Sequence, residues 1–332
     1  MPNKIKIGIP KSLFYYYYTP FWHTLFKELD IKIIYSEDTN KKILDQGLKS
    51  SINELCIPIK LLIGHVLNLK DKVDFILLPY YITMEKDSYF CPKLIAAADI
   101  IKANFQNINL LSPDVNMNNF SQSLYSSLKE MIIKLGINPI KLVNAGKVAI
   151  EAQKKFEELK IKNQIFPIAL KNSINKKQIN NSNIKKNQNV TLAVIGHSYV
   201  INDTYISSNI IQKLIDKKVN IVTSDMVSSE IIKENVTILD KIPHWTLGNA
   251  VFGSAVHYSK QKNIDGIIYV TPFGCSSDSL VMEFLHTHLK NKKPFMTITV
   301  DEHSGDAGLV TRIEAFLDMI IIKKENKKNV YN

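Results

Sequence analysis

The side chains in this sequence best suited to bind a metal are three cysteines, Cys56, Cys91 and Cys275. Cys56 stands two residues before Pro58, Cys91 stands directly before Pro92, and Cys275 lies in the loop FGCSSDS. Each position favours the turn that opens a helix, where the helix dipole and free backbone N–H groups stabilise a thiolate. Soft thiolates bind zinc, cuprous copper or iron–sulfur clusters. A metal site with these three ligands is therefore our first hypothesis.

The same cysteines have other interpretations. A free cysteine is more often a small buried hydrophobic residue than a ligand, and the sequence contains no C-x-x-C pair. A zinc site would need a fourth ligand, for which the candidates are His65, His257 and His303, although none has a zinc-finger spacing. In favour of iron, a Cys-Pro pair such as that at Cys91 recurs among iron–sulfur ligands.

A second group of candidates lies after the strand-like run MTITV. Glu302 and His303 follow this run, and Arg312 is the only arginine in a chain with 42 Lys and Arg residues. An arginine kept where lysine fills every other cationic position indicates a need for its planar, bidentate geometry. We predict that these three residues line or brace a binding crevice. Thr311 and Glu314 have the spacing of a capping box, so Glu314 is interpreted as a helix cap.

The loop GHSYVIND is another candidate for ligand contact, through His197 and Asp203. Turn and N-cap chemistry explain Ser198, Asn202 and Asp203 equally well. The sequence has no G-x-x-x-x-G-K-[ST] loop, no G-x-G-x-x-G after its first apolar run and no G-x-S-x-G turn. ATP binding, dinucleotide binding and serine-hydrolase chemistry therefore lack their usual signatures.

The elements that must position these residues alternate between short apolar runs and longer amphipathic segments. This alternation predicts an α/β fold with parallel sheets, and ligands of such sheets bind beyond the carboxyl ends of the strands. We predict two Rossmann-like (flavodoxin-like) parallel-sheet domains with an interdomain cleft. The strand-like runs are IKIGIP, IKIIYS, DFILLPY, INLLSPD, VTLAVIGHS, VNIVTS, DGIIYVTPFG and PFMTITVDE.

A length of 332 residues fits two domains. The expected boundaries are 1–137 for an N-terminal α/β domain, 138–189 for a connecting helix and a polar Asn/Lys-rich linker, and 190–332 for a C-terminal α/β domain. The net charge of +11 comes from scattered lysines without a nucleic-acid-binding fingerprint, so we expect no nucleic acid partner. The sequence shows neither a signal peptide nor an apolar run of membrane-spanning length, which predicts a cytoplasmic protein without membrane contact.

Six segments carry a resemblance to known proteins over nearly the whole chain outside the linker. They are IGIPKSLFYYYYTPFWHTLFKELD, NELCIPIKLLIGHV, YFCPKL, GHSYVIND, TPFGCSSDS and VDEHSGDAGLVTRIEAFLD. Together they resemble the acyl-CoA dehydratase activase-related family, which is similar to the iron–sulfur subunits of 2-hydroxyacyl-CoA dehydratases and to double-cubane cluster proteins. The resemblance implies a [4Fe-4S] cluster held by Cys56, Cys91 and Cys275.

The resemblance also implies a role in electron transfer in anaerobic metabolism. A separate ATP-dependent activator would reduce the cluster, and dehydratase relatives pass such an electron to a CoA thioester so that water can be removed. Because this chain lacks the phosphate-binding motifs of the activator, we expect the activator in trans. Three cysteines are too few for a double-cubane cluster, which would need ligands from a partner in a homo- or heterodimer.

The sequence therefore supports two hypotheses about function. The first is an iron–sulfur protein that acts as a low-potential reductase or as a 2-hydroxyacyl-CoA dehydratase-like lyase. The alternative is a metal-free two-domain protein that binds a small molecule or docks a partner, in which the cysteines are packing residues. Iron and sulfide analysis separates the two.

Overall fold

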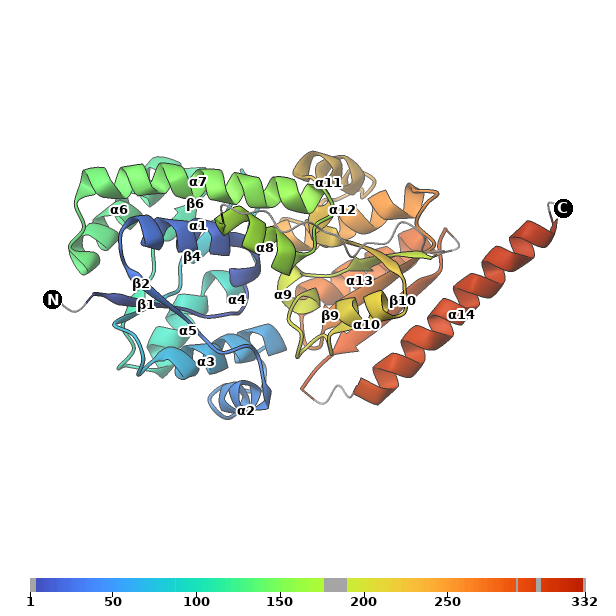
Figure 1. Cartoon of the computed structure of the whole chain (residues 1–332), viewed down its shortest axis with the longest axis horizontal. Coiled ribbons are helices and arrows are strands. Elements are labelled where there is room, and N and C mark those ends of the chain that lie inside the picture. The colour runs from blue at the N-terminus through green and yellow to red at the C-terminus, as the bar shows by residue number, and fades with distance from the viewer. Residues whose placement is uncertain (1–3, 87, 176–189, 291, 303–305, 331–332) are drawn as a thin grey trace. The chain divides into compact units, whose positions relative to one another are not determined.

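The fold is taken from a computed structural model of the chain, which describes residues 4–86, 88–175, 190–290, 292–302 and 306–330 (Figure 1). The chain forms two compact units. The first unit takes in Met1–Ile179 and Pro243–Leu247, and the second takes in Asn180–Ile242 and Gly248–Asn332. Both contain parallel strands connected through helices, so the predicted α/β class with parallel sheets is confirmed.

The first unit is built on a four-stranded parallel sheet with the strand order β2-β1-β3-β5. Each strand coincides with one of the apolar runs in the N-terminal half of the sequence. A separate two-stranded parallel sheet pairs β4 with β6, and the sequence pattern did not predict it. The strands are β1 (Lys6–Ile9), β2 (Lys32–Tyr35), β3 (Phe75–Leu77), β4 (Tyr80–Thr83), β5 (Leu110–Leu111) and β6 (Asp114–Asn116).

Helices of the first unit include two that the sequence analysis assigned to the connector. The helices α7 and α8 pack against α1 and against each other, and Figure 1 shows α7 running beside α1. Residues 176–189 lie outside the described residues. The helices are α1 (Tyr15–Glu28), α2 (Lys41–Lys49), α3 (Ile57–Leu69), α4 (Pro92–Ile95), α5 (Ala97–Asn104), the 3-10 helix η1 (Met117–Asn119), α6 (Phe120–Leu135), α7 (Pro139–Ile161) and α8 (Phe166–Ile174).

Two glycines allow α2 and α3 to cross at very short range. A Cβ atom added to Gly47 would lie 2.0 Å from the carbonyl oxygen of Lys60, and one added to Gly64 would lie 2.0 Å from that of Ile43. No side chain fits at such distances, so the crossing depends on both glycines. It also fixes α3, the helix that begins directly after Cys56.

The second unit is built on a four-stranded parallel sheet with the order β10-β9-β7-β8. All seven residues of β9 are buried, as expected for a central strand covered by helices on both faces. Its elements are β7 (Thr191–Ile195), α9 (Ser198–Ile201), α10 (Ile210–Asp216), β8 (Asn220–Thr223), the 3-10 helix η2 (Ser224–Met226), α11 (Ser229–Val236), α12 (Thr246–Lys260), β9 (Gly266–Pro272), α13 (Ser276–Leu289), β10 (Phe295–Val300) and α14 (Asp306–Val330).

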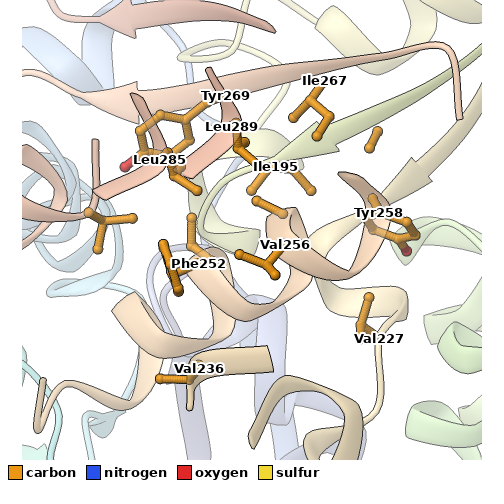
Figure 2. Packing of buried hydrophobic residues seen from close by; sticks show 14 of the residues in the cluster. Ile195, Val227, Val236, Phe252, Val256, Tyr258, Ile267, Tyr269, Leu285 and Leu289 are labelled. Atoms are coloured by element: carbon orange, nitrogen blue, oxygen red, sulfur yellow. The ribbon is translucent and has the colours of Figure 1, made fainter. Parts of the chain in front are cut away.

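The core on one face of the second sheet brings α12 and α13 against β7 and β9 (Figure 2). Phe252 of α12 and Tyr269 of β9 are among its largest fully buried side chains. Burial of each large apolar side chain stabilises the fold by about 1.5–3 kcal/mol relative to exposure. This packing holds the strand ends, and the loops that follow them, in fixed positions.

The final helix, α14, packs its first half on the same sheet. Phe316 and Ile320 lie against Gly266 at the start of β9, and Ile313 is fully buried. Arg312 lies on this helix. Within the described residues, no helix is both long enough and apolar enough to cross a lipid bilayer.

Candidate functional site

Cys56 and Cys91 occupy equivalent positions in the first unit. Cys56 is the N-cap of α3 and Cys91 is the N-cap of α4, each followed by a proline in the first turn. The Nζ of Lys93 donates to the carbonyl oxygen of Glu54 over 3.0 Å, which ties the two cysteine loops together. The predicted location of both cysteines at helix starts is confirmed.

The two thiols of the first unit differ in their surroundings. Cys56 is buried and Cys91 is partly exposed. Burial raises the pKa of the Cys56 thiol above its ordinary value, the nearby Cys91 raises it further, and Lys93 and the backbone N–H of Ile59 oppose the rise. Burial therefore outweighs the stabilisation of the thiolate that its helix-start position predicts. A bound cation would reverse this balance, because metal-bound thiols are deprotonated.

Cys275 lies in the second unit, at the end of the central strand β9. The loop of Phe273 and Gly274 leads from β9 to Cys275, which is the N-cap of α13. Its Sγ atom lies 3.3 Å from the Oγ of Ser277. The third cysteine thus also stands where the sequence predicts it, directly before a helix and beyond the carboxyl end of a parallel strand.

A buried histidine–aspartate pair lies at the same end of the second sheet. The Nε2 of His197 lies 2.7 Å from the Oδ1 of Asp278, and the two side chains are 3% and 1% exposed. The hydroxyl of Thr271 donates to the other carboxylate oxygen over 3.4 Å, and the His197 ring stacks on Tyr199. The Nδ1 of His197 is buried and has no partner among the described residues.

This pair connects the ends of two adjacent strands. His197 follows β7 through Gly196, and Asp278 lies in the first turn of the helix that follows β9. The chain leaves β7 toward one edge of the sheet and β9 toward the other, so the pair marks the point where ligands of such folds usually bind. His197 could be predicted from the sequence and Asp278 could not, because the two residues are 81 positions apart.

The other polar residues of the GHSYVIND loop have structural roles. The Oδ1 of Asp203 accepts hydrogen bonds from the backbone N–H groups of Tyr205 and Ile206. The Oγ of Ser198 donates to Asp225 over 3.2 Å and accepts from the side chain of Asn202. Of the two interpretations of Asp203 and Asn202, turn formation is the one these bonds support.

The predicted residues near the C-terminal strand are only partly brought together. Glu302 lies two residues after β10 and is half-buried, whereas His303 lies outside the described residues. Arg312 is exposed on α14 and donates from Nη2 to the carbonyl oxygen of Thr297 in β10. The interpretation of Glu314 as a helix cap is wrong, because α14 begins at Asp306; the carboxylate instead pairs with the Nζ of Lys217 at 2.6 Å.

Two histidines considered for zinc are already engaged. The Nδ1 of His65 lies 2.8 Å from the Oγ of Ser36, and its Nε2 lies 3.0 Å from the Oγ1 of Thr39. Burial lowers the pKa of His65 to about 3, and Lys11 contributes. His257 pairs with Gln261. No group of three or more His, Cys, Asp or Glu side chains within the described part of the chain is arranged to hold a metal ion.

Comparison with known families gives two matches that together span most of the chain. Residues 6–227 match the family described as CoA enzyme activase uncharacterised domain (DUF2229). Residues 199–320 match 2-hydroxyglutaryl-CoA dehydratase, D-component. This second match includes Cys275 and Asp278 and begins two residues after His197. No curated protein matches the chain. Because the first match covers more than half of its length, the chain belongs to the CoA enzyme activase uncharacterised domain family.

Proposed function

We propose that this protein is an iron–sulfur component of a 2-hydroxyacyl-CoA dehydratase-like system. The observation that carries the proposal is that all three cysteines are N-cap residues of helices, within a chain matched by a CoA enzyme activase family and a dehydratase component. Thiolates at such positions are suitable ligands for iron. Cys56, Cys91 and Cys275 would hold a [4Fe-4S] cluster.

The three cysteine thiols are chemically suitable ligands for a [4Fe-4S] cluster. Three cysteines that form no disulfide are present, and each is the N-cap residue of a helix. When bound, the cluster would supply one electron at low potential. The residues of the chain would hold it, exclude water from it and tune its potential through burial and nearby N–H groups.

The same proposal includes two Rossmann-like domains and roles for three residues near the C-terminal strand. Two Rossmann-like domains, with boundaries near 1–137 and 190–332 and a connector at 138–189, are supported by the two parallel sheets. Glu302, His303 and Arg312 would line or brace the substrate-binding region. The bond from Arg312 to Thr297 favours a bracing role for this side chain.

The partners follow from the missing phosphate-binding motifs. A separate ATP-dependent activator would deliver the electron in the cytoplasm, and a CoA thioester would accept it. The whole protein would then act as a low-potential reductase or as a dehydratase-like lyase, in a homo- or heterodimer. Neither nucleic acid nor membrane is a partner in this proposal.

The test is iron and acid-labile sulfide analysis, with absorption and EPR spectra, on protein prepared and reconstituted without oxygen. We expect about four irons per chain. Each of the single variants Cys56→Ala, Cys91→Ala and Cys275→Ala should fail to assemble a stable cluster. Ser277→Ala is the matched control, because it removes the hydroxyl beside Cys275 and leaves all three thiols.

Two results would overturn the proposal. The first is iron content that stays unchanged in all three cysteine variants. The second is the absence of iron and sulfide after anaerobic reconstitution of the wild-type protein, which would instead favour a metal-free protein that binds a small molecule or docks a partner. Stoichiometric zinc in place of iron would favour a structural Cys/His site.

A further inference from the structure

A small cavity lies at the carboxyl ends of β1 and β3 in the first unit. It has a volume of about 40 Å³. Its wall includes Ile9 at the end of β1, Leu13 in the loop that follows, Leu77 at the end of β3, Leu78 directly after it, and Ala97 at the start of α5. The chain leaves β1 toward β2 and β3 toward β5, on opposite sides. The cavity therefore occupies the switch point of the first sheet, where α/β proteins bind ligands.

The wall of the cavity is mostly apolar and carries no charged side chain. None of its lining residues is Asp, Glu, Lys, Arg or His, so an ionic ligand would lose its hydration without compensation. Phe14, Tyr15 and Pro79 also line the cavity and are only partly buried. A water needs about 10–15 Å³ of such space, so the volume admits roughly three or four non-hydrogen atoms.

One hydrogen-bond donor in the wall has no acceptor within the described part of the chain. The indole Nε1–H of Trp22 donates to the hydroxyl oxygen of Tyr81 over 2.7 Å, and both residues line the cavity. Tyr81 is 3% exposed, and no acceptor for its own O–H proton is found among the described residues. Burial raises the pKa of the Tyr81 hydroxyl above its ordinary value, so the proton is present at neutral pH. A buried donor without a partner costs about 1–3 kcal/mol.

The loop that forms the cavity is also strained. Leu13 is 3% exposed and has a φ of +49°, in the left-handed region that branched or bulky residues rarely adopt. The carbonyl groups of Ser12 and Leu13 accept the first N–H groups that lead into α1, which holds this conformation. Strain of this kind is common where the backbone shapes a binding site.

We propose that the cavity binds the short acyl end of an uncharged carbonyl compound, such as an ester, thioester or amide of acetyl or propionyl size. The carbonyl oxygen accepts the free proton of Tyr81, and the acyl carbons contact Leu13, Leu77 and Ala97. The size of the cavity sets the length of the acyl group, and its lack of charge excludes free carboxylates. The proposal needs no cluster and therefore stands or falls separately from the proposed function.

The test uses iron-free protein, with propionamide as the probe. Trp22 reports on the cavity directly, and Trp245→Phe removes the only other tryptophan. In this background we expect propionamide to shift the Trp22 emission saturably and to receive magnetisation from the protein in saturation-transfer NMR. Propionate, which has the same size and a charge, and pivalamide, which is too bulky, should each bind at least about tenfold more weakly.

Three variants make the result specific. Ala97→Leu adds three carbon atoms to the wall and should abolish binding. Tyr81→Phe removes the donor and should weaken binding by about threefold to tenfold. Tyr18→Phe is the matched control, because the Tyr18 ring stacks on Tyr81 without lining the cavity, and it should bind normally. Absence of both signals with wild-type protein, or binding that Ala97→Leu leaves unchanged, would overturn the proposal.

Discussion

The two units use the same sheet pattern and fill its ligand-binding position differently. Counted along each unit, both sheets have the strand order 2-1-3-4. In the first unit the ends of the two central strands enclose an apolar cavity beside Tyr81. In the second unit the equivalent ends are joined by the buried pair of His197 and Asp278. One topology therefore supports an apolar cavity in the first unit and a buried polar pair in the second, and the side chains decide which.

Removal of the polar pair in the second unit should have the largest effect on the free energy of unfolding. Asp278→Ala leaves His197 buried without a partner for either ring nitrogen, and we expect the free energy of unfolding to fall by about 3–5 kcal/mol. Urea unfolding measures the loss. Asp240→Ala, at an exposed position, is the control and should change stability by no more than about 0.5 kcal/mol.

The same experiment separates a structural pair from a ligand site. If the double variant His197→Phe with Asp278→Leu recovers most of the stability, the pair is not needed for folding, since apolar replacements of buried pairs are often tolerated. If the single Asp278→Ala variant is as stable as the wild-type protein, the claim that the buried pair of His197 and Asp278 holds the two strand ends together is contradicted.

The first unit depends instead on close backbone contact. Gly64→Ala places a Cβ atom 2.0 Å from the carbonyl oxygen of Ile43, and separating α2 from α3 should cost about 2–3 kcal/mol. Gly146→Ala in α7 is the matched control, because its new Cβ atom meets nothing within 4 Å. That control should stabilise the protein by up to about 1 kcal/mol. Equal effects at both glycines would show that the tight crossing is not required.

Most of the sheet could be predicted from the sequence because its signals are local. The apolar runs from IKIGIP to PFMTITVDE correspond to the strands of the two four-stranded sheets, and the Pro residues after Cys56 and Cys91 mark helix starts. The helices α7 and α8 fall within residues 138–189, which the sequence pattern assigned to a connecting helix and a polar linker. Their buried aromatic residues, such as Phe156 and Phe166, pack through contacts with residues far away in the sequence, which no local pattern reveals.

The candidate site was less predictable, because its members meet only through the fold. Asp278 reads as an ordinary residue of a helix start until β7 and β9 bring His197 to it. Tyr81 and Trp22 are 59 positions apart and look like core aromatics in the sequence. The capping interpretation of Glu314 failed for a related reason, since the spacing T-x-x-E occurs well inside α14.

The buried His65 of the first unit gives a pH test of stability. His65 is held neutral between two hydroxyls, and its pKa of about 3 lies below the 6.5 of an unfolded histidine. The unfolded chain therefore takes up a proton as the pH falls below about 6.5, whereas the folded chain does not until about pH 3. The contribution of neutral His65 to the free energy of unfolding is therefore fully present above pH 6.5. The free energy of unfolding should fall by about 2 kcal/mol between pH 6.5 and 5.

Urea unfolding at these two pH values, on wild-type protein and on His65→Gln, measures the contribution of His65. The variant should lose less stability on acidification than the wild type, because the group that titrates is gone. His286→Gln, at an exposed histidine, should keep the wild-type difference. If His65→Gln keeps it too, the neutral, buried state of His65 is contradicted.

The smallest expected effect concerns Arg312, the lone arginine. Its guanidinium reaches from the exposed side of α14 to the carbonyl oxygen of Thr297 on β10, so Arg312→Lys should cost about 0.5–1 kcal/mol of stability. If the side chain only braces the edge of the second sheet, this variant will assemble a cluster normally in the anaerobic iron analysis. A variant with unchanged stability and lost substrate-dependent activity would instead place Arg312 among the binding residues, because a bracing bond acts through the fold and a binding contact acts through the ligand.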